Sequence, residues 1–242
     1  MIEKKVEIKT ADGVADGYYY AERPGLPGVV MYTDILGVRP TFQDMAKRLA
    51  AEGYAVLLPN VFYRVSKMPV FDFAPKFGEE KTVARIGELR PSVATDLFAR
   101  DAGSYADFVA KESGGRSVGA VGYCMGGAMA MRTAAARGNV TAVASFHGSN
   151  LAADTPDSPH LQAPKIKARL YFGFAVEDKT MPPEAIAKLN AALDAAHVRH
   201  EDDTYEGARH GWCVKDHNVY NPAQADLARR RLLTFFAEAL AA

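Results

Sequence analysis

Short apolar runs alternate along this chain with longer segments of helical periodicity. The apolar runs of strand length are Val29–Thr33, Tyr54–Leu58, Val118–Tyr123, Ala142–Phe146 and Leu170–Phe174, and the polar segment His200–Tyr205 is strand-like. The helix-like segments are Thr41–Ala51, Met125–Arg137, Ala185–Ala196 and Ala223–Leu240. Because strands that alternate with helices pair in parallel, this pattern predicts an α/β fold. Its central sheet is expected to be mostly parallel, with helices on both faces.

Two stretches depart from the alternation. Val6–Lys9 and Gly17–Ala21 flank an Asp-Gly turn signal, which predicts a hairpin at the start of the chain. Ser66–Arg100 carries prolines and several aromatic residues, and we expect a long, partly helical excursion of the kind that forms lids or pocket walls. No shift of composition marks a boundary, so residues 1–242 are expected to form one domain.

Composition narrows the classes of function. Lys plus Arg and Asp plus Glu each number 29, so no net charge favours nucleic acid or an anionic membrane as a partner. Two cysteines in 242 residues are too few for a disulfide scaffold or a Cys-rich zinc site. The charged N-terminus and the lack of a long apolar run predict a cytoplasmic protein. We expect no metal and no cofactor, and a monomer or a small homo-oligomer.

The segment that follows the run Val118–Tyr123 carries the strongest chemical signal. It reads Gly122-Tyr-Cys-Met-Gly-Gly127, which is the nucleophile elbow G-x-S-x-G with Cys124 in the serine position. The helix that starts there presents free N–H groups, and the one of Met125 is expected to stabilise an oxyanion. The alternative is a buried structural cysteine beside glycines that pack a helix.

A base and an orienting acid are expected to follow the nucleophile in the order acid, then histidine. Asp178 lies just past the apolar run Leu170–Phe174, and His210 lies past His200–Tyr205. Both positions suit loops at the carboxyl edge of a parallel sheet. Glu177 is the rival acid. The remaining histidines fit less well, although His147 is expected near the pocket.

These motifs resemble the dienelactone hydrolase family. The resemblance rests on residues 122–127, Asp178, Arg209-His210-Gly211 and the loop Asp34-Ile35-Leu36-Gly37. It implies an α/β-hydrolase fold and a carboxylic ester hydrolase that acts on a small-molecule ester or enol-lactone. It further implies a Cys124, Asp178 and His210 triad, with the N–H of Ile35 as the second oxyanion donor. In the family, the acid at Asp34 interacts with the cysteine.

The chain departs from the family pattern at two positions. Asp34 stands where a glutamate is usual, and Val214 stands where well-known members hold the substrate carboxylate with an arginine. The excursion offers other arginines for that purpose, namely Arg64, Arg85 and Arg90. Of these, Arg85 is taken as the candidate pocket residue.

Two aromatic side chains, Tyr63 and Trp212, are expected to form pocket walls, with core packing as the equal alternative.

The sequence therefore predicts hydrolysis through a thioester on Cys124. Two other readings stay open. One is a ligand-binding protein that kept the pocket and lost turnover. The other is a thiol redox protein in which Cys213 resolves an oxidised Cys124, although no C-x-x-C motif is present.

Overall fold

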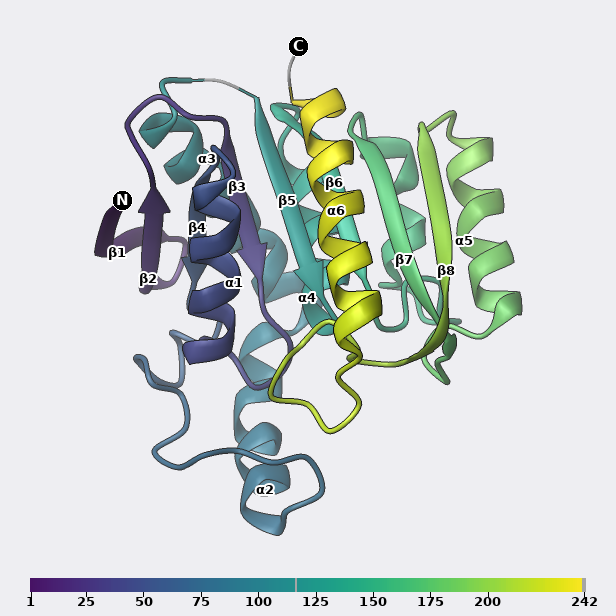
Figure 1. Cartoon of the computed structure of the whole chain (residues 1–242), viewed down its shortest axis with the longest axis horizontal. Helices are drawn as coiled ribbons and strands as arrows, with labels where there is room; N and C mark the ends of the chain where they lie inside the picture. The colour runs from purple at the N-terminus through teal and green to yellow at the C-terminus, as the bar shows by residue number, and fades with distance from the viewer. Residues whose placement is uncertain (116, 241–242) are drawn as a thin grey trace.

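The structure, a computed structural model, describes residues 1–115 and 117–240 and contains one eight-stranded sheet (Figure 1). Its strands are β1 Ile2–Thr10, β2 Gly13–Ala21, β3 Gly28–Tyr32, β4 Ala55–Pro59, β5 Val118–Tyr123, β6 Val140–Phe146, β7 Arg169–Glu177 and β8 His200–Arg209. They lie in the order β1-β2-β4-β3-β5-β6-β7-β8. The hairpin β1–β2 joins β4 antiparallel and the remaining neighbours are parallel, so the predicted architecture is confirmed.

Helices cover both faces of the sheet. They are α1 Pro40–Ala51, α2 Glu80–Leu89, α3 Thr95–Glu112, α4 Met125–Ala136, α5 Pro183–Ala195 and α6 Pro222–Ala239, with short 3-10 turns at Arg90–Val93 and Pro159–Lys165. In Figure 1, α1 and α6 lie in front of the sheet, and α3 and α4 lie behind it. None of the helices in residues 1–115 and 117–240 has the length and apolar character that a membrane crossing requires.

The central strands are apolar throughout because each is buried on both sides. In β3, Val29 and Met31 pack in the cluster that includes residues of α1 and α6. Val30 and Tyr32 point the other way, into the cluster that includes residues of α3 and α4. Successive side chains of a strand face opposite sides, so an unbroken apolar run is what a sheet between two helical layers requires.

The excursion predicted at Ser66–Arg100 lies beyond the carboxyl edge of the sheet, where α2 projects in Figure 1. The helix α3 that follows continues to Glu112, beyond the end of that stretch. It buries Asp101, which is 1% exposed, because Arg64 pairs with that carboxylate at 2.6 Å. A buried acid on a helix is not expected from an apolar pattern, since its partner comes from a distant loop.

The junction of β5 and α4 is the sharpest turn of the backbone near this edge. Cys124 adopts φ 56° and ψ −119°, a conformation that side-chain-bearing residues rarely take. A Cβ on Gly122 would overlap the carbonyl group of Gly126, and one on Gly126 would lie 2.5 Å from the carbonyl oxygen of Tyr32. The glycines of the motif are therefore required by close backbone approach.

This packing predicts that Gly122→Ala lowers the free energy of unfolding by about 3 kcal/mol, since the added methyl group meets backbone that cannot rotate away. Gly87→Ala is the matched control. Gly87 lies inside α2 with open space at its Cβ position, so alanine there should raise stability by up to about 1 kcal/mol. Urea unfolding of both variants measures the difference. Equal stabilities would contradict the backbone-contact explanation.

Candidate active site

Three side chains from separate loops meet at the carboxyl edge of the sheet. Cys124 stands at the β5–α4 junction, Asp178 follows the last residue of β7, and His210 follows the last residue of β8. Cys124 and His210 both line a cavity of about 730 Å³. The loops after parallel strands converge at this edge, so the fold alone brings together residues that are far apart in sequence.

The acid and the histidine form a short, oriented pair. His210 Nδ1 lies 2.7 Å from Asp178 Oδ2. The other carboxylate oxygen accepts hydrogen bonds from the backbone N–H and the hydroxyl of Thr180, at 2.8 and 2.7 Å. Glu177 is exposed and pairs only loosely with Arg209, at 3.5 Å. The acid beside the imidazole is therefore Asp178.

The surroundings of His210 favour its charged form. Burial acts to lower its pKa, but the hydrogen bond to Asp178 and the interaction with Cys124 outweigh burial and raise the pKa to about 10. An imidazolium then faces the sulfur at neutral pH. The N-terminus of α4 begins at Cys124, and the Ser149 hydroxyl lies 3.4 Å from Sγ, so a negative sulfur is stabilised on two further sides.

Two backbone N–H groups beside the sulfur are free to bind an oxyanion. Among the described residues, neither Ile35 nor Met125 donates its N–H to a protein acceptor, and both residues line the cavity. The turn that carries Ile35 is closed by Asp34. Its side chain accepts the N–H of Leu36 at 2.9 Å, and its carbonyl accepts that of Gly37 at 3.1 Å. The free N–H of Ile35 is thus held in place.

The partners of Asp34 differ from the cysteine that the family resemblance implied. Its carboxylate is fully buried, accepts two hydrogen bonds from Arg39 at 2.7 and 2.8 Å, and lies 2.9 Å from His217 Nε2. Burial acts to raise its pKa, but His217 and Arg39 lower it to about 2. No hydrogen bond joins Asp34 to Cys124 in the described part of the chain. Its position fits a structural anchor of the loop.

Two expected pocket residues lie elsewhere. The hydroxyl of Tyr63 bonds to Thr10 at 2.8 Å and to Asp101 at 3.0 Å, inside the core. Arg85 donates to a backbone carbonyl and to Glu88 at 2.6 Å. Neither lines the cavity. Sequence position alone placed them near the site, but their partners turn them away from it.

His147 and Trp212 form a layer behind His210 rather than a cavity wall. Both are fully buried, and the ring of His147 lies edge-on to those of His210 and Trp212, at centroid distances of 5.2 and 5.1 Å. Neither ring nitrogen of His147 has a hydrogen-bond partner among the described residues. Burial, and then the charge of His210, hold its pKa well below the usual value.

The cavity wall contains residues that sequence reasoning missed. The excursion does supply walls, as predicted, through Phe77, Val93 and Phe98, and Arg90 lies there too. The α4 residues that line the cavity are Met125, Ala128, Met129 and Arg132. These residues are three or four positions apart, which marks one face of a helix, so the sequence carried a signal for Arg132. His217 lines the cavity because Asp34 holds it there.

Metal binding and disulfide chemistry have fewer suitable side chains at this edge of the sheet. Across residues 1–115 and 117–240, no cluster of three His, Cys, Asp or Glu side chains is arranged to hold a metal ion. The second thiol, Cys213, does not line this cavity. Burial raises the pKa of Cys213 well above its usual value, so its sulfur stays protonated.

The chain is similar to known proteins over most of its length. The chain matches the dienelactone hydrolase family over residues 16–240. It is 29% identical to a Synechocystis protein provisionally named carboxymethylenebutenolidase over 231 residues, which cover 93% of this chain and 89% of the relative. It is also 29% identical to a Rhodococcus opacus carboxymethylenebutenolidase over 212 residues, or 86% and 79% of the two chains.

The fold is shared with a solved structure from Klebsiella pneumoniae that carries the provisional name dienelactone hydrolase. The TM-score is 0.84 at 22% identity, and the match covers 98% of both chains. This likeness confirms the α/β-hydrolase fold. The family match over residues 16–240 shows that the chain belongs to the dienelactone hydrolase family.

Proposed function

We propose that this carboxylic ester hydrolase cleaves its substrate through a Cys124–His210–Asp178 triad and a thioester acyl-enzyme. One observation carries the proposal: an imidazole held by a buried carboxylate at 2.7 Å faces the sulfur at the elbow. Packing alone gives no reason for a histidine that is held by a carboxylate to face a free thiol at a strained turn. A histidine whose Nδ1 is engaged presents Nε2 to the nucleophile, as the triad requires.

The first half of the reaction forms the thioester. The thiolate of Cys124 attacks the carbonyl carbon, and the carbonyl electrons move to oxygen as the C–S bond forms. The resulting oxyanion accepts hydrogen bonds from the N–H groups of Ile35 and Met125, each worth about 10²–10³-fold in rate. Collapse of the adduct breaks the C–O bond, and His210 Nε2 gives its proton to the departing alkoxide or enolate.

The second half frees the enzyme. A water molecule loses a proton to the now neutral His210 and attacks the thioester carbon. The same two N–H groups hold the second oxyanion. When this adduct collapses, the C–S bond breaks, the acid product leaves, and the sulfur returns as the thiolate beside the imidazolium. Asp178 stabilises the positive ring at both stages.

The walls of the cavity favour a small ester or enol-lactone. Phe77 and Phe98 provide apolar surface, while Arg90 and Arg132 provide positive charge on the same cavity. Arg132 is anchored by the hydroxyl of Thr95 at 3.1 Å. A thiolate leaves a tetrahedral adduct easily, so forward reaction needs a group that leaves more easily still. Enol-lactones and activated esters meet this requirement better than amides.

Cys124→Ala tests the nucleophile. We expect kcat/KM for p-nitrophenyl acetate to fall by about 10³-fold or more, because no other group can form the acyl-enzyme. His210→Ala should fall similarly. His197→Asn is the matched control for the histidine, since His197 is exposed at the end of α5 and has a φ of 55° that asparagine tolerates.

Two outcomes of that experiment would contradict the triad. One is undiminished hydrolysis by folded Cys124→Ala. The other is a wild-type protein that binds esters and enol-lactones without turning any of them over, which would favour the ligand-binding reading.

Asp178→Asn tests the charge on the histidine. In the wild type, hydrolysis should decline as pH rises through about 10, because His210 then loses the proton that the leaving group needs. Loss of the carboxylate charge lowers the pKa of His210, so the decline should move toward the ordinary histidine value of about 6.5. The profile of kcat/KM against pH, corrected for spontaneous hydrolysis, measures the shift. Glu177→Gln, at the exposed neighbour, should leave the decline in place, and an unshifted profile in Asp178→Asn would exclude the proposed role.

A further inference from the structure

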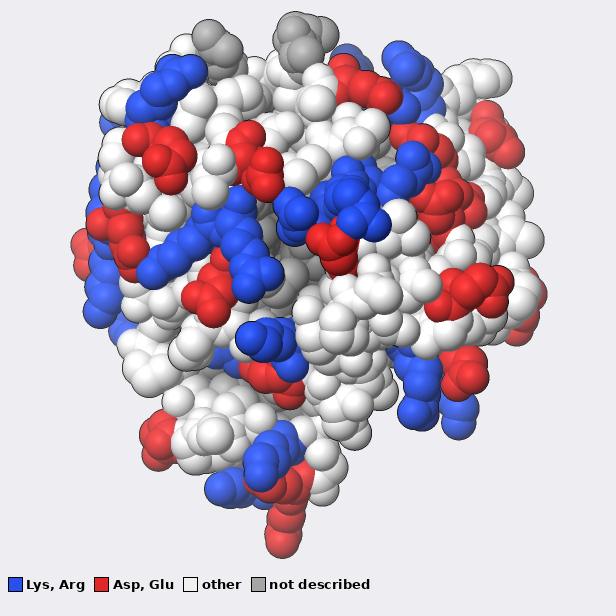
Figure 2. Space-filling view, viewed as in Figure 1, with Lys and Arg blue, Asp and Glu red and all other residues white. Residues whose placement is uncertain are grey.

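A second cavity lies between α1 and α6, on the face of the sheet that Figure 1 shows in front. On the same face, Figure 2 shows a hollow with Lys and Arg side chains beside it. Its volume is about 150 Å³, and it shares no lining residue with the catalytic cavity. None of the proposed catalytic residues lines it, so the hydrolysis mechanism does not account for it.

The floor of this α1–α6 cavity suits a flat apolar ring. Tyr123 and Phe146 stack there with centroids 5.6 Å apart and an interplanar angle of 17°. The side chains of Met31, Met45 and Leu232 complete the apolar walls. Thioethers pack well against aromatic rings, and a volume of about 150 Å³ is enough for a molecule of the size of benzene.

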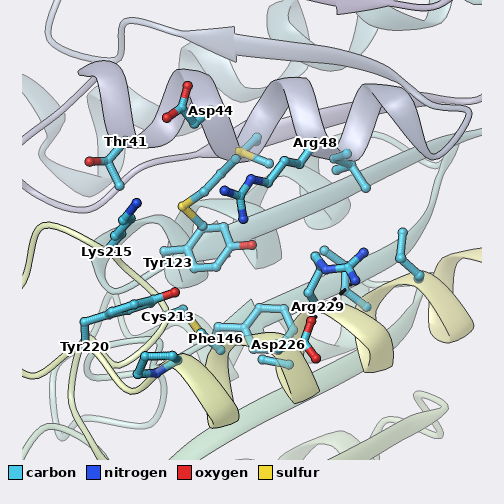
Figure 3. Close-up of a pocket in the computed structure, with 18 of the residues that line it drawn as sticks. Thr41, Asp44, Arg48, Tyr123, Phe146, Cys213, Lys215, Tyr220, Asp226 and Arg229 are labelled. Carbon is cyan, nitrogen blue, oxygen red and sulfur yellow. Dashed lines mark hydrogen bonds and ion pairs between the residues drawn. The ribbon is translucent and has the colours of Figure 1, made fainter.

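The hydroxyl of Tyr123 opens into the cavity. The residue is only 6% exposed, and none of the hydrogen bonds among the described residues uses its hydroxyl. The hydroxyl faces the cavity, and Arg48 reaches from α1 toward it (Figure 3). A phenol can donate a hydrogen bond as well as accept one. Tyr123 and Arg48 together offer donors to one acceptor group above the aromatic floor.

The charges on the rim favour an anion as that acceptor. Arg229 is paired with Glu52 at 2.8 Å and is therefore already neutralised. Arg48 and Lys215 form no ion pair among the described residues, and Asp44 is the one lining acid left to balance them. Asp44 lies on α1 away from the tyrosine hydroxyl (Figure 3). A carboxylate bound between Arg48 and Tyr123 would satisfy both.

The cavity also contacts the chain segments that carry the catalytic groups. Tyr123 directly precedes Cys124 at the elbow. Cys213 lies three residues after His210 in the loop that follows β8, and its thiol opens into this cavity. A ligand that pushes on either side chain moves backbone that is joined to the catalytic residues. A bound ligand can therefore change the positions of the reacting groups.

We propose that the α1–α6 cavity is a regulatory site that binds a small aromatic carboxylate and thereby changes hydrolysis at the catalytic cavity. The change in hydrolysis rests on the proposed function, whereas binding does not. Binding is therefore measured first, in a variant that cannot turn over.

The binding experiment uses benzoate and the Cys124→Ala variant, and ligand-observed NMR follows the titration. We expect saturable binding of benzoate with half-saturation at about 1 mM, the range for a ligand of this size. In that background, Arg48→Gln and Tyr123→Phe should each raise the concentration needed by about tenfold. Lys47→Gln is the matched control, because Lys47 is the neighbour on α1 that pairs with Glu3 outside the cavity.

The activity experiment uses the wild type and p-nitrophenyl acetate. Benzoate should change kcat by at least about twofold at saturation, and Arg48→Gln should shift this response to higher concentration while Lys47→Gln does not. Absence of saturable binding, or binding that is equal in Arg48→Gln, would overturn the site. Binding without any effect on kcat, or an effect on KM alone, would overturn its regulatory role and leave the triad proposal untouched.

Discussion

The sharp reversal of the backbone at Cys124 is the constraint on which the catalytic edge depends. It lifts the sulfur out of the sheet at the start of α4, and it is possible only because β3, β5 and α4 approach one another backbone to backbone. That same approach brings the loop after β3 to the cavity that Cys124 lines, together with Ile35 and Met125. The proposed nucleophile and the proposed oxyanion donors therefore depend on one packing arrangement. Side chains at the glycine positions would separate these elements.

Two acid–histidine pairs lie at this edge of the sheet, and the residues that surround each pair differ. Asp178 holds His210 and is itself held by Thr180 alone, so the imidazole remains partly accessible to the cavity. Asp34 is locked between Arg39 and His217 and is fully buried. The first pair is suited to exchanging a proton, and the second to keeping a loop rigid. His147, neutral and buried, separates the first pair from the core without adding charge.

Local patterns were enough to predict the sheet and the elbow and to place Asp178 and His210 just past strands, whereas the choice of Asp178 over Glu177 rested on the family resemblance. Each of these features depends on a few adjacent residues: an apolar run, a glycine at a tight turn, or a position just past a strand. The wall residues depend on distant partners instead. Tyr63 and Arg85 are turned away by hydrogen bonds to Thr10 and Glu88, and Asp34 finds Arg39 and His217 rather than the sulfur. Such pairings follow from the three-dimensional arrangement, and the hydrophobic periodicity of the sequence does not indicate them.

Part of the cavity wall comes from a stretch of chain separate from the loops that carry the proposed reacting groups. Those groups stand on loops of the sheet, whereas the excursion before β5 supplies Phe77, Arg90 and Phe98 to the same cavity. That excursion pairs with no strand of the sheet. Its length and composition can therefore drift while the turn at the nucleophile stays intact. Proteins with this architecture can acquire new substrates through changes in one surface segment, while the loops that carry the proposed reacting groups stay the same.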